Sequence, residues 1–268
     1  SKIFCSCKNE FGGEPNTRCC PVCIGLPGTL PVLNKEAIKL CIIAGLSLNC
    51  EISETFSMAR KNYFYPDLPK AYQITQLTEP ICKNGFVLLS NNRKIRINRI
   101  QIEEDAGKLI HDADPSFTLI DYNRCGVPLI EIVTEPDIRS VDETVEFLDK
   151  IKTVLKFTGV SDCKMQEGSL RCDVNVSVKK SDQEKLNQRV EYKNLNSFSA
   201  AARAVRYEES RQKNIYSDGG FVESATMKWD DSLGKAVLMR SKEEAMDYRY
   251  FPEPDIPKIK ISKEYINS

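Results

Sequence analysis

Five of the eleven cysteines lie within the first 23 residues, where they could bind a metal ion. Cys5 and Cys7 form one close pair, and Cys20 and Cys23 form a second pair with the C-x-x-C spacing. Two such thiolate pairs in loops can close a tetrahedron around Zn²⁺, which soft sulfur ligands favour over hard cations. The spacing predicts a structural zinc site with these four ligands and with Cys19 left over. Two unrelated thiols beside a redox pair are the alternative.

Carboxylates form the second chemically suggestive group, because three segments carry an acid on or beside an apolar strand. These acids are the run 103–105, Glu131 within Leu-Ile-Glu-Ile-Val, and Glu191 within Val-Glu-Tyr-Lys-Asn. A charge in an apolar strand is costly unless it is paired or bound to a metal. Mg²⁺ with a nucleotide phosphate would suit such hard oxygen ligands. A salt bridge from Glu131 is the alternative, and its candidate partners are Arg99, Arg124 and Arg171.

Other catalytic templates are missing from the sequence. It contains neither G-x-x-x-x-G-K-[S/T] nor G-x-G-x-x-G, the patterns typical of phosphate-binding loops. The one histidine, His111, lies in a polar segment and fits an ordinary surface residue better than a member of a Ser-His-Asp triad. The aromatic segment 63–69, broken by two prolines, predicts an ordered loop that is either a packed elbow or a surface for stacking a nucleotide base.

Charge and composition exclude several classes of protein. Lys+Arg and Asp+Glu both number 38, so bulk positive charge does not provide affinity for nucleic acid, although a local patch could hold a tRNA. No run of 18 apolar residues could span a membrane. No secretion signal opens the chain, and Ser1 in place of an initiator Met indicates a start inside a longer chain. The six dispersed cysteines fit buried thiols in a reducing compartment, so we expect a cytoplasmic protein.

The elements that must position these residues are helices and strands without a regular βαβ alternation, which predicts an α+β fold with a mainly antiparallel sheet. Alternation with a period of two predicts a hairpin over 86–102 that turns at Asn91 and Asn92. Further strands are predicted at 129–133, 171–179 and 189–195, with a final hairpin turning near 233–234. Helices are predicted over 35–46 after Asn34, over 141–157 after a capping box of Ser140 and Glu143, and over 198–216.

Seven longer motifs, which follow one another from end to end of the chain, resemble the B subunits of bacterial aspartyl/glutamyl-tRNA amidotransferases. One is Asn-Thr-x-x-Cys-Pro-Val-Cys-Ile-Gly-Leu-Pro-Gly (16–28), another is Asp-Tyr-Asn-Arg-Cys-Gly-Val-Pro-Leu-Ile-Glu-Ile-Val (121–133), and a third is Glu-Gly-Ser-Leu-Arg-Cys-Asp-Val-Asn (167–175). The others are 60–70, 103–108, 193–198 and 247–255. The cysteine pairs resemble the zinc-bearing form of the family.

The resemblance implies a glutamine-synthetase-like cradle domain over residues 34–268, with residues 1–33 as its zinc-binding lobe. Family members work with a glutaminase A subunit and a small C subunit. With ATP and Mg²⁺ the B subunit phosphorylates the side-chain carboxylate of a misacylated Glu-tRNA(Gln) or Asp-tRNA(Asn), and ammonia from the A subunit then displaces phosphate to give the amide. We expect a chain cut short at both ends, without the family's C-terminal helical and tail domains.

The family's functional positions can be carried over by motif. The resemblance implies Mg²⁺ ligation by Glu104, Glu131 and Glu191. It further implies a pocket for ATP and the aminoacyl group, to which Glu167, Arg171, Asp173, Asn175, Lys193, Lys61 and Tyr65 are assigned.

Two departures from the family pattern leave alternatives open. The family's opening Glu-Val-His motif, which helps to ligate the metal, is expected before residue 1, and residues 224–227 read Ser-Ala-Thr-Met where the family usually has Gln-Glu-Thr-Arg. One alternative is an inactive, zinc-stabilised module that binds the glutaminase subunit. The other is a free-standing carboxylate–amine ligase that acts on a small acid.

Overall fold

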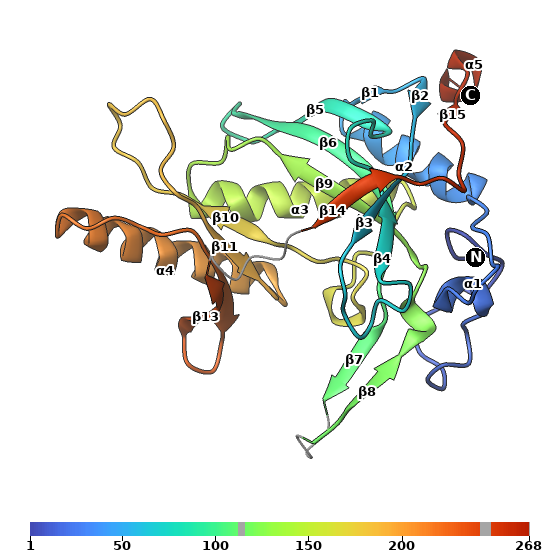
Figure 1. Ribbon diagram of the computed structural model, residues 1–268. Coiled ribbons are helices and arrows are strands. Elements are labelled where there is room, and N and C mark those ends of the chain that lie inside the picture. Colours follow the sequence, from blue (N-terminus) through green and yellow to red (C-terminus); the bar gives the residue numbers. More distant parts are fainter. Residues whose placement is uncertain (112–115, 242–247, 268) are drawn as a thin grey trace. The chain divides into compact units, whose positions relative to one another are not determined.

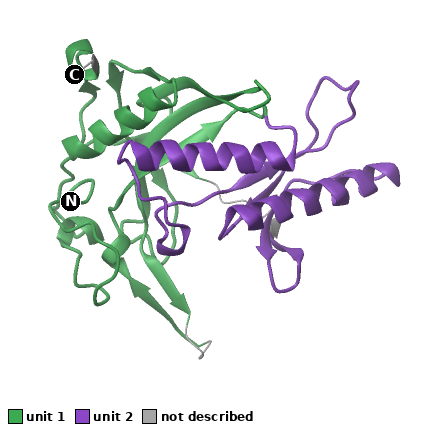
Figure 2. Ribbon diagram, turned by 180° about the vertical axis from the view of Figure 1, so that it is seen from behind, with its two compact units in different colours: residues 1–137, 247–268 green, residues 138–246 purple. Residues whose placement is uncertain are grey.

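The computed structural model describes residues 1–111, 116–241 and 248–267, which form two compact units (Figures 1 and 2). Unit 1 comprises residues 1–137 and 247–268, and unit 2 comprises residues 138–246. The predicted boundary after residue 33 falls inside unit 1. No helix among the described residues is both long and apolar enough to cross a bilayer.

The predicted α+β class with antiparallel sheets is confirmed, with one local exception. The main sheet of unit 1 has the order β1-β5-β6-β9, and all its pairings are antiparallel. Among the described residues, the one parallel pairing joins β11 to β12 in unit 2. The bounds of the main sheet are β1 Glu51–Ile52, β5 Cys82–Leu88, β6 Lys94–Glu104 and β9 Pro128–Thr134.

The predicted 86–102 hairpin is the β5–β6 pair, and the turn between them carries Asn92 with φ of 62°. The isoleucines at 95, 97, 100 and 102 are almost fully buried and form the core face of β6. Helix α2 (Lys35–Ser47) begins where expected, because the Asn34 side chain accepts a hydrogen bond from the Glu36 amide. One face of strand β6 thus packs into the core through its isoleucines, and the side chains on its other face are polar.

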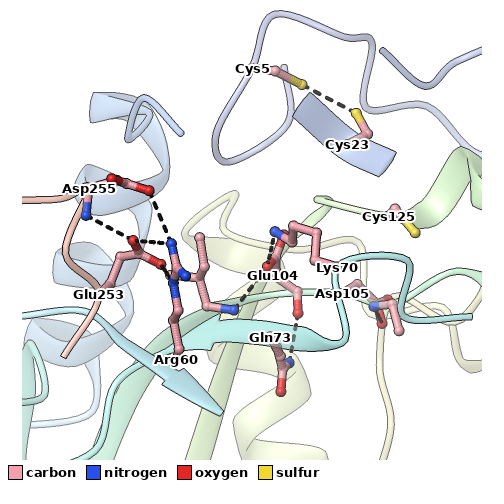
Figure 3. A network of polar contacts seen from close by, with 12 residues as sticks. Cys5, Cys23, Arg60, Lys70, Gln73, Glu104, Asp105, Cys125, Glu253 and Asp255 are labelled. Atoms are coloured by element: carbon pink, nitrogen blue, oxygen red, sulfur yellow. Dashed lines mark hydrogen bonds and ion pairs between the residues drawn. The ribbon is translucent and has the colours of Figure 1, made fainter. Parts of the chain in front are cut away.

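A second, smaller sheet of unit 1 has the order β14-β3-β4. Its strands are β3 Ala59–Asn62, β4 Tyr72–Thr75 and β14 Arg249–Pro252, and the predicted aromatic loop connects β3 to β4. Arg60 joins β3 to the returning chain, since its guanidinium donates to Glu253 at 2.7 Å and to Asp255 at 3.0 Å (Figure 3). The same guanidinium lies 4.2 Å from the centre of the Tyr72 ring.

The remaining elements of unit 1 are short. β2 (Thr55–Phe56) pairs with β15 (Ile259–Lys260), and β7 (Lys108–His111) pairs with β8 (Thr118–Asp121). His111 is exposed at the end of β7, so it lies in a strand rather than in the predicted polar segment between elements. The short helices are α1 Pro21–Ile24, η1 Tyr122–Arg124 and α5 Lys263–Asn267.

The described part of unit 2 contains two α-helices, a short 3-10 helix and a sheet of order β10-β11-β12-β13 (Figure 2). Ser140 and Ser197 cap the two helices by accepting hydrogen bonds from the amides of Glu143 and Ala200. The expected capping box is modified, because the Glu143 carboxylate accepts from the Arg139 amide. The bounds are α3 Val141–Phe157, η2 Met165–Glu167, β10 Val174–Val176, β11 Val190–Lys193, α4 Phe198–Ser217, β12 Ala225–Asp230 and β13 Lys235–Ser241.

The core of unit 2 lies between α4 and one face of this sheet, where Tyr192, Ala204 and Trp229 belong to one buried cluster. Its polar centre is Glu208, which is fully buried on α4. The Tyr192 hydroxyl and the Gln212 amide each donate to Glu208 at 2.7 Å, and Arg211 donates to both of its carboxylate oxygens. The opposite face of β11, with Glu191 and Lys193, is left outside the core.

Replacing Tyr192 with Phe should remove one donor from the buried Glu208 carboxylate. Because a buried acceptor that loses a partner costs about 1–3 kcal/mol, the free energy of unfolding in urea should fall by about that amount. Tyr65→Phe is the control, because Tyr65 is 46% exposed, and this change should alter the free energy of unfolding little. Equal stability of Tyr192→Phe and wild type would contradict the importance of this bond.

Candidate functional site

The four cysteines predicted to bind zinc come together in unit 1. Their Sγ atoms lie within 4.8 Å of one another. From Cys23 Sγ, the distances are 3.5 Å to Cys5, 3.7 Å to Cys20 and 3.8 Å to Cys7. A zinc tetrahedron with Zn–S bonds of about 2.3 Å has edges of about 3.8 Å, whereas a disulfide needs about 2.05 Å between its sulfurs. The spacing therefore fits one tetrahedral metal ion and no disulfide.

Local structure explains how the cluster forms. Cys20 is the N-cap of α1 and Cys23 lies within this single turn, so the C-x-x-C pair is presented by one turn of helix. Gly25 ends the turn with φ of 67°, a left-handed conformation that glycine adopts without strain. Cys19 points elsewhere, since its thiol contacts the Asn16 carbonyl at 3.4 Å. The four-ligand set with Cys19 left over thus agrees with the spacing in the sequence.

The electrostatics of the cluster also suit a cation. Burial and the neighbouring cysteines raise the pKa of Cys7 to about 11, and burial raises the pKa of Cys5 further. Burial acts in the same sense on Cys20, but hydrogen bonds from the Cys23 amide and the Cys7 thiol outweigh it and lower the pKa of Cys20 to about 7. Several thiolates this close repel one another, and a divalent ion is what would stabilise them together.

The acids of 103–105 point in different directions. Glu104 is 3% exposed and belongs to the core side of β6, where its carboxylate accepts from the Lys70 ammonium and from the Ile74 amide at 2.9 Å (Figure 3). Asp105 lies 3.4 Å from Arg124. Glu104 therefore has a buried partner of its own, and it is the neighbouring Glu103, not among the residues expected to bind Mg²⁺, that projects to the other face of β6.

Glu103 and Glu131 share the polar face of the β6–β9 pair. Glu131 is opposite Gln101, whose side-chain amide donates to it at 2.7 Å. The Thr75 hydroxyl donates to Glu103 at 2.8 Å. Burial and the charge of Glu131 raise the pKa of Glu103, while Thr75, Lys61 and Gln101 oppose this rise. Two carboxylates thus repel each other on one face, which is what a divalent cation would relieve.

The premise that Glu131 is a charge buried in an apolar strand is wrong, because its side chain is exposed. The candidate arginine partners in unit 1 bind elsewhere. Arg99 donates to Gln101 at 2.8 Å, and Arg124 donates to the carbonyls of Ala106 and Gly107. Solvent access, rather than burial, is what leaves Glu131 available to a ligand.

Lys61 and the aromatic residues border this acidic face. The Lys61 ammonium lies 4.3 Å from the centre of the Tyr248 ring and 5.7 Å from that of Tyr63. Tyr63 packs edge-on against Tyr248 with 5.3 Å between ring centres, as expected for a packed elbow. Phe64 and Tyr65 in the same loop are 83% and 46% exposed, so the tip of the loop also offers rings for stacking.

The predicted site residues of unit 2 gather on the polar face of its sheet, with two exceptions. Lys193 lies 2.7 Å from Asp173 and 3.1 Å from Glu191, and the Thr226 hydroxyl donates to Glu191 at 3.1 Å. Burial acts against the charge on Lys193, but the two carboxylates outweigh it and raise its pKa. Asn175 pairs directly with Glu191 across the β10–β11 ladder.

The two exceptions lie before β10. Glu167, in η2, pairs with Lys164 at 3.0 Å, and Arg171 is exposed in the segment that follows. The altered 224–227 segment keeps two useful polar groups, since Ser224 donates to Gln188 at 2.7 Å and Thr226 contacts Glu191. Joint ligation of one Mg²⁺ by Glu131 and Glu191 stays a prediction, because these residues belong to different units.

Comparisons with known proteins place this α+β chain in a known family. The GatB/GatE catalytic domain model matches residues 1–267, so the chain belongs to this family. Curated aspartyl/glutamyl-tRNA(Asn/Gln) amidotransferase B subunits are similar over 99% of the chain, at 58% identity for Caldicellulosiruptor saccharolyticus and 57% for Ruminiclostridium cellulolyticum. The chain spans 56% of the length of these relatives. The resemblance seen in the motifs is confirmed.

Replacing Cys23 with Ser should release about one equivalent of zinc per chain and unfold residues 1–33, because structural zinc contributes about 10–16 kcal/mol of apparent binding energy in small domains. Metal analysis and circular dichroism are the measurements. Cys19→Ser is the matched control, since Cys19 is a neighbouring thiol outside the cluster, and it should keep its zinc. Folded wild type without any zinc would rule out the site.

Proposed function

We propose that this chain is the catalytic part of a tRNA-dependent amidotransferase, with a cradle-like catalytic domain and a zinc-stabilised lobe. Its substrates are misacylated Glu-tRNA(Gln) and Asp-tRNA(Asn), and it works in the cytoplasm with a glutaminase subunit and a small third subunit. The names of relatives at 54–58% identity support the reaction class. The observation that carries the proposal is the pair of facing carboxylates, Glu103 and Glu131, on the polar face of β6 and β9.

The proposed reaction has two steps. An oxygen of the substrate's side-chain carboxylate attacks the γ-phosphorus of ATP, which forms an acyl phosphate and releases ADP. The nitrogen of ammonia then attacks the acyl carbon, inorganic phosphate leaves, and the nitrogen loses a proton to give the amide. The first step brings a carboxylate to the polyphosphate, and the second builds negative charge on the acyl oxygen and the leaving phosphate, so positioning and charge neutralisation are the main tasks of the protein.

We assign Glu103 and Glu131 of unit 1 to Mg²⁺. The ion supplies neutralising charge to phosphate oxygens when it is bound. Gln101 orients Glu131 through the 2.7 Å hydrogen bond, and Thr75 orients Glu103 through the 2.8 Å bond. We assign Glu104, the other acid expected at the metal, to holding the end of β6 through its buried pair with Lys70.

Basic and aromatic groups complete the proposed machinery. Lys61, which opposes the raised pKa of Glu103, provides positive charge for phosphate, and the exposed ring of Tyr65 is offered for stacking a base. In unit 2, Lys193 holds Asp173 and Glu191 in place, and we assign this face to binding of the nucleotide or the aminoacyl group. We assign Asn175, on the same face, to this binding, whereas Glu167 and Arg171, which lie before β10, are carried over from the family motif alone.

The proposal is tested by combining the chain, in its complete enzyme with the partner subunits, with ATP, Mg²⁺, glutamine and misacylated tRNA. Conversion of Glu-tRNA(Gln) to Gln-tRNA(Gln), or of Asp-tRNA(Asn) to Asn-tRNA(Asn), is the expected result. Turnover of ATP with free glutamate and ammonia, without tRNA, would instead identify a small-acid ligase. Binding of the glutaminase subunit without binding of ATP would identify an inactive module.

Glu131→Gln should weaken Mg²⁺-dependent ATP binding at least about tenfold, because even residues that only orient metal ligands contribute 10–100-fold to affinity. Thermal stability should stay near wild type, since Glu131 is exposed. Glu135→Gln is the matched control, because Glu135 is an acid of the same segment that is bonded to Asn98. A large loss of melting temperature with intact ATP binding would assign Glu131 a structural role.

A further inference from the structure

Lys2 is a charged residue that the proposed reaction does not use, and it is fully buried, with 0% of its surface exposed. Its backbone is fixed from both sides, since its amide donates to the Cys7 carbonyl at 3.0 Å and its carbonyl accepts from Asn34 at 3.1 Å. Its stem runs past Gly126, where an added Cβ would lie 3.7 Å from Lys2 Cδ. The ammonium group is therefore delivered to a defined place inside the lobe.

The ammonium group of Lys2 contacts a cysteine sulfur of the cluster. Lys2 Nζ lies 3.5 Å from Cys23 Sγ, which is its one hydrogen-bond partner among the residues that the structure describes. The buried carboxylate of Glu104 already accepts from Lys70, and that of Asp105 lies 3.4 Å from Arg124. A buried ammonium without an anionic partner would be very costly. The thiolate of Cys23 is the group that can supply the opposite charge.

The net charge of a four-thiolate zinc site explains why a neighbouring ammonium group would stabilise it. Four thiolates carry four negative charges and Zn²⁺ carries two positive charges, so the filled site has a net charge of minus two in a partly buried lobe. One neighbouring ammonium halves this excess. A hydrogen bond from Nζ to Cys23 Sγ also fixes the direction of one metal ligand, which is how outer groups tune metal sites.

We infer that Lys2 is the built-in counter-charge of the zinc cluster: its buried ammonium stabilises the metal-bound thiolate of Cys23 and sets the affinity of the lobe for zinc. The inference rests on the proposed zinc site but not on the proposed reaction.

The test compares zinc affinity of the full chain by chelator competition in wild type, Lys2→Met, Lys2→Arg and Lys8→Met. Lys2→Met keeps an apolar stem but removes the charge, and it should weaken zinc binding about 10–100-fold. Lys2→Arg keeps the charge and should stay closer to wild type. Lys8→Met removes a lysine of the same lobe whose side chain is 75% exposed, so it should leave the affinity unchanged.

A second measurement separates this role from simple packing. In the zinc-loaded state Lys2→Met should unfold more easily than wild type, whereas after chelation the two should be about equally stable, because residues 1–33 are then unfolded and Lys2 no longer lies beside the cluster. Equal losses of stability in both states, including loss of the fold in both, would overturn the inference. So would equal zinc affinities of Lys2→Met and Lys8→Met. If folded wild type contained no zinc, the proposed metal site itself would be ruled out, and the inference with it.

Discussion

The need of every buried charge for an opposite charge organises unit 1. Glu253 has no exposed side-chain surface and is matched by Arg60, which thereby ties the returning strand β14 to β3. Glu104 is matched by Lys70, whose stem is packed so closely against Gly25 that an added Cβ would lie 2.2 Å from Lys70 Cγ. Gly25 ends the helical turn that carries two metal ligands. Lys70 therefore contacts both the helical turn of the cysteine lobe and Glu104 at the end of β6.

Strand β6 shows how two adjacent acids take different roles. Side chains alternate between the two faces of a strand, so Glu104 follows Ile102 into the core while Glu103 follows Gln101 to the polar side. The buried Glu104 holds the strand in place through Lys70, and Glu103 faces Glu131. Fixing the strand and presenting the acid are thus separate tasks, and a change at one position acts on the other only through the backbone.

The sequence predicted local features well because they depend on near neighbours. Caps at Asn34 and Ser140, the β5–β6 hairpin and the C-x-x-C turn each follow from residues a few positions apart. Alternation around Ile102 also predicts that Glu103, and not Glu104, lies on the polar face of β6. The parallel β11–β12 pairing, the return of β14 to β3 and the contact of Lys2 with Cys23 join distant segments, and no local pattern encodes them.

The polar face of the β6–β9 pair in unit 1 and the polar face of the sheet in unit 2 differ in how their charges are balanced. In unit 2, Lys193 lies within 3.1 Å of Glu191 and 2.7 Å of Asp173, so these acids have a cation of their own. In unit 1, Gln101 and Thr75 donate to Glu131 and Glu103, and burial together with the charge of Glu131 raises the pKa of Glu103, while the nearby Lys61 opposes this rise without forming an ion pair among the described residues. Neutral donors orient carboxylates without cancelling their charge. The carboxylates of unit 1 thus lack the direct ion pair that Lys193 provides in unit 2, which supports the proposed binding of a divalent ion in unit 1, and the face of unit 2 is better suited to groups that exchange hydrogen bonds with an existing ion pair.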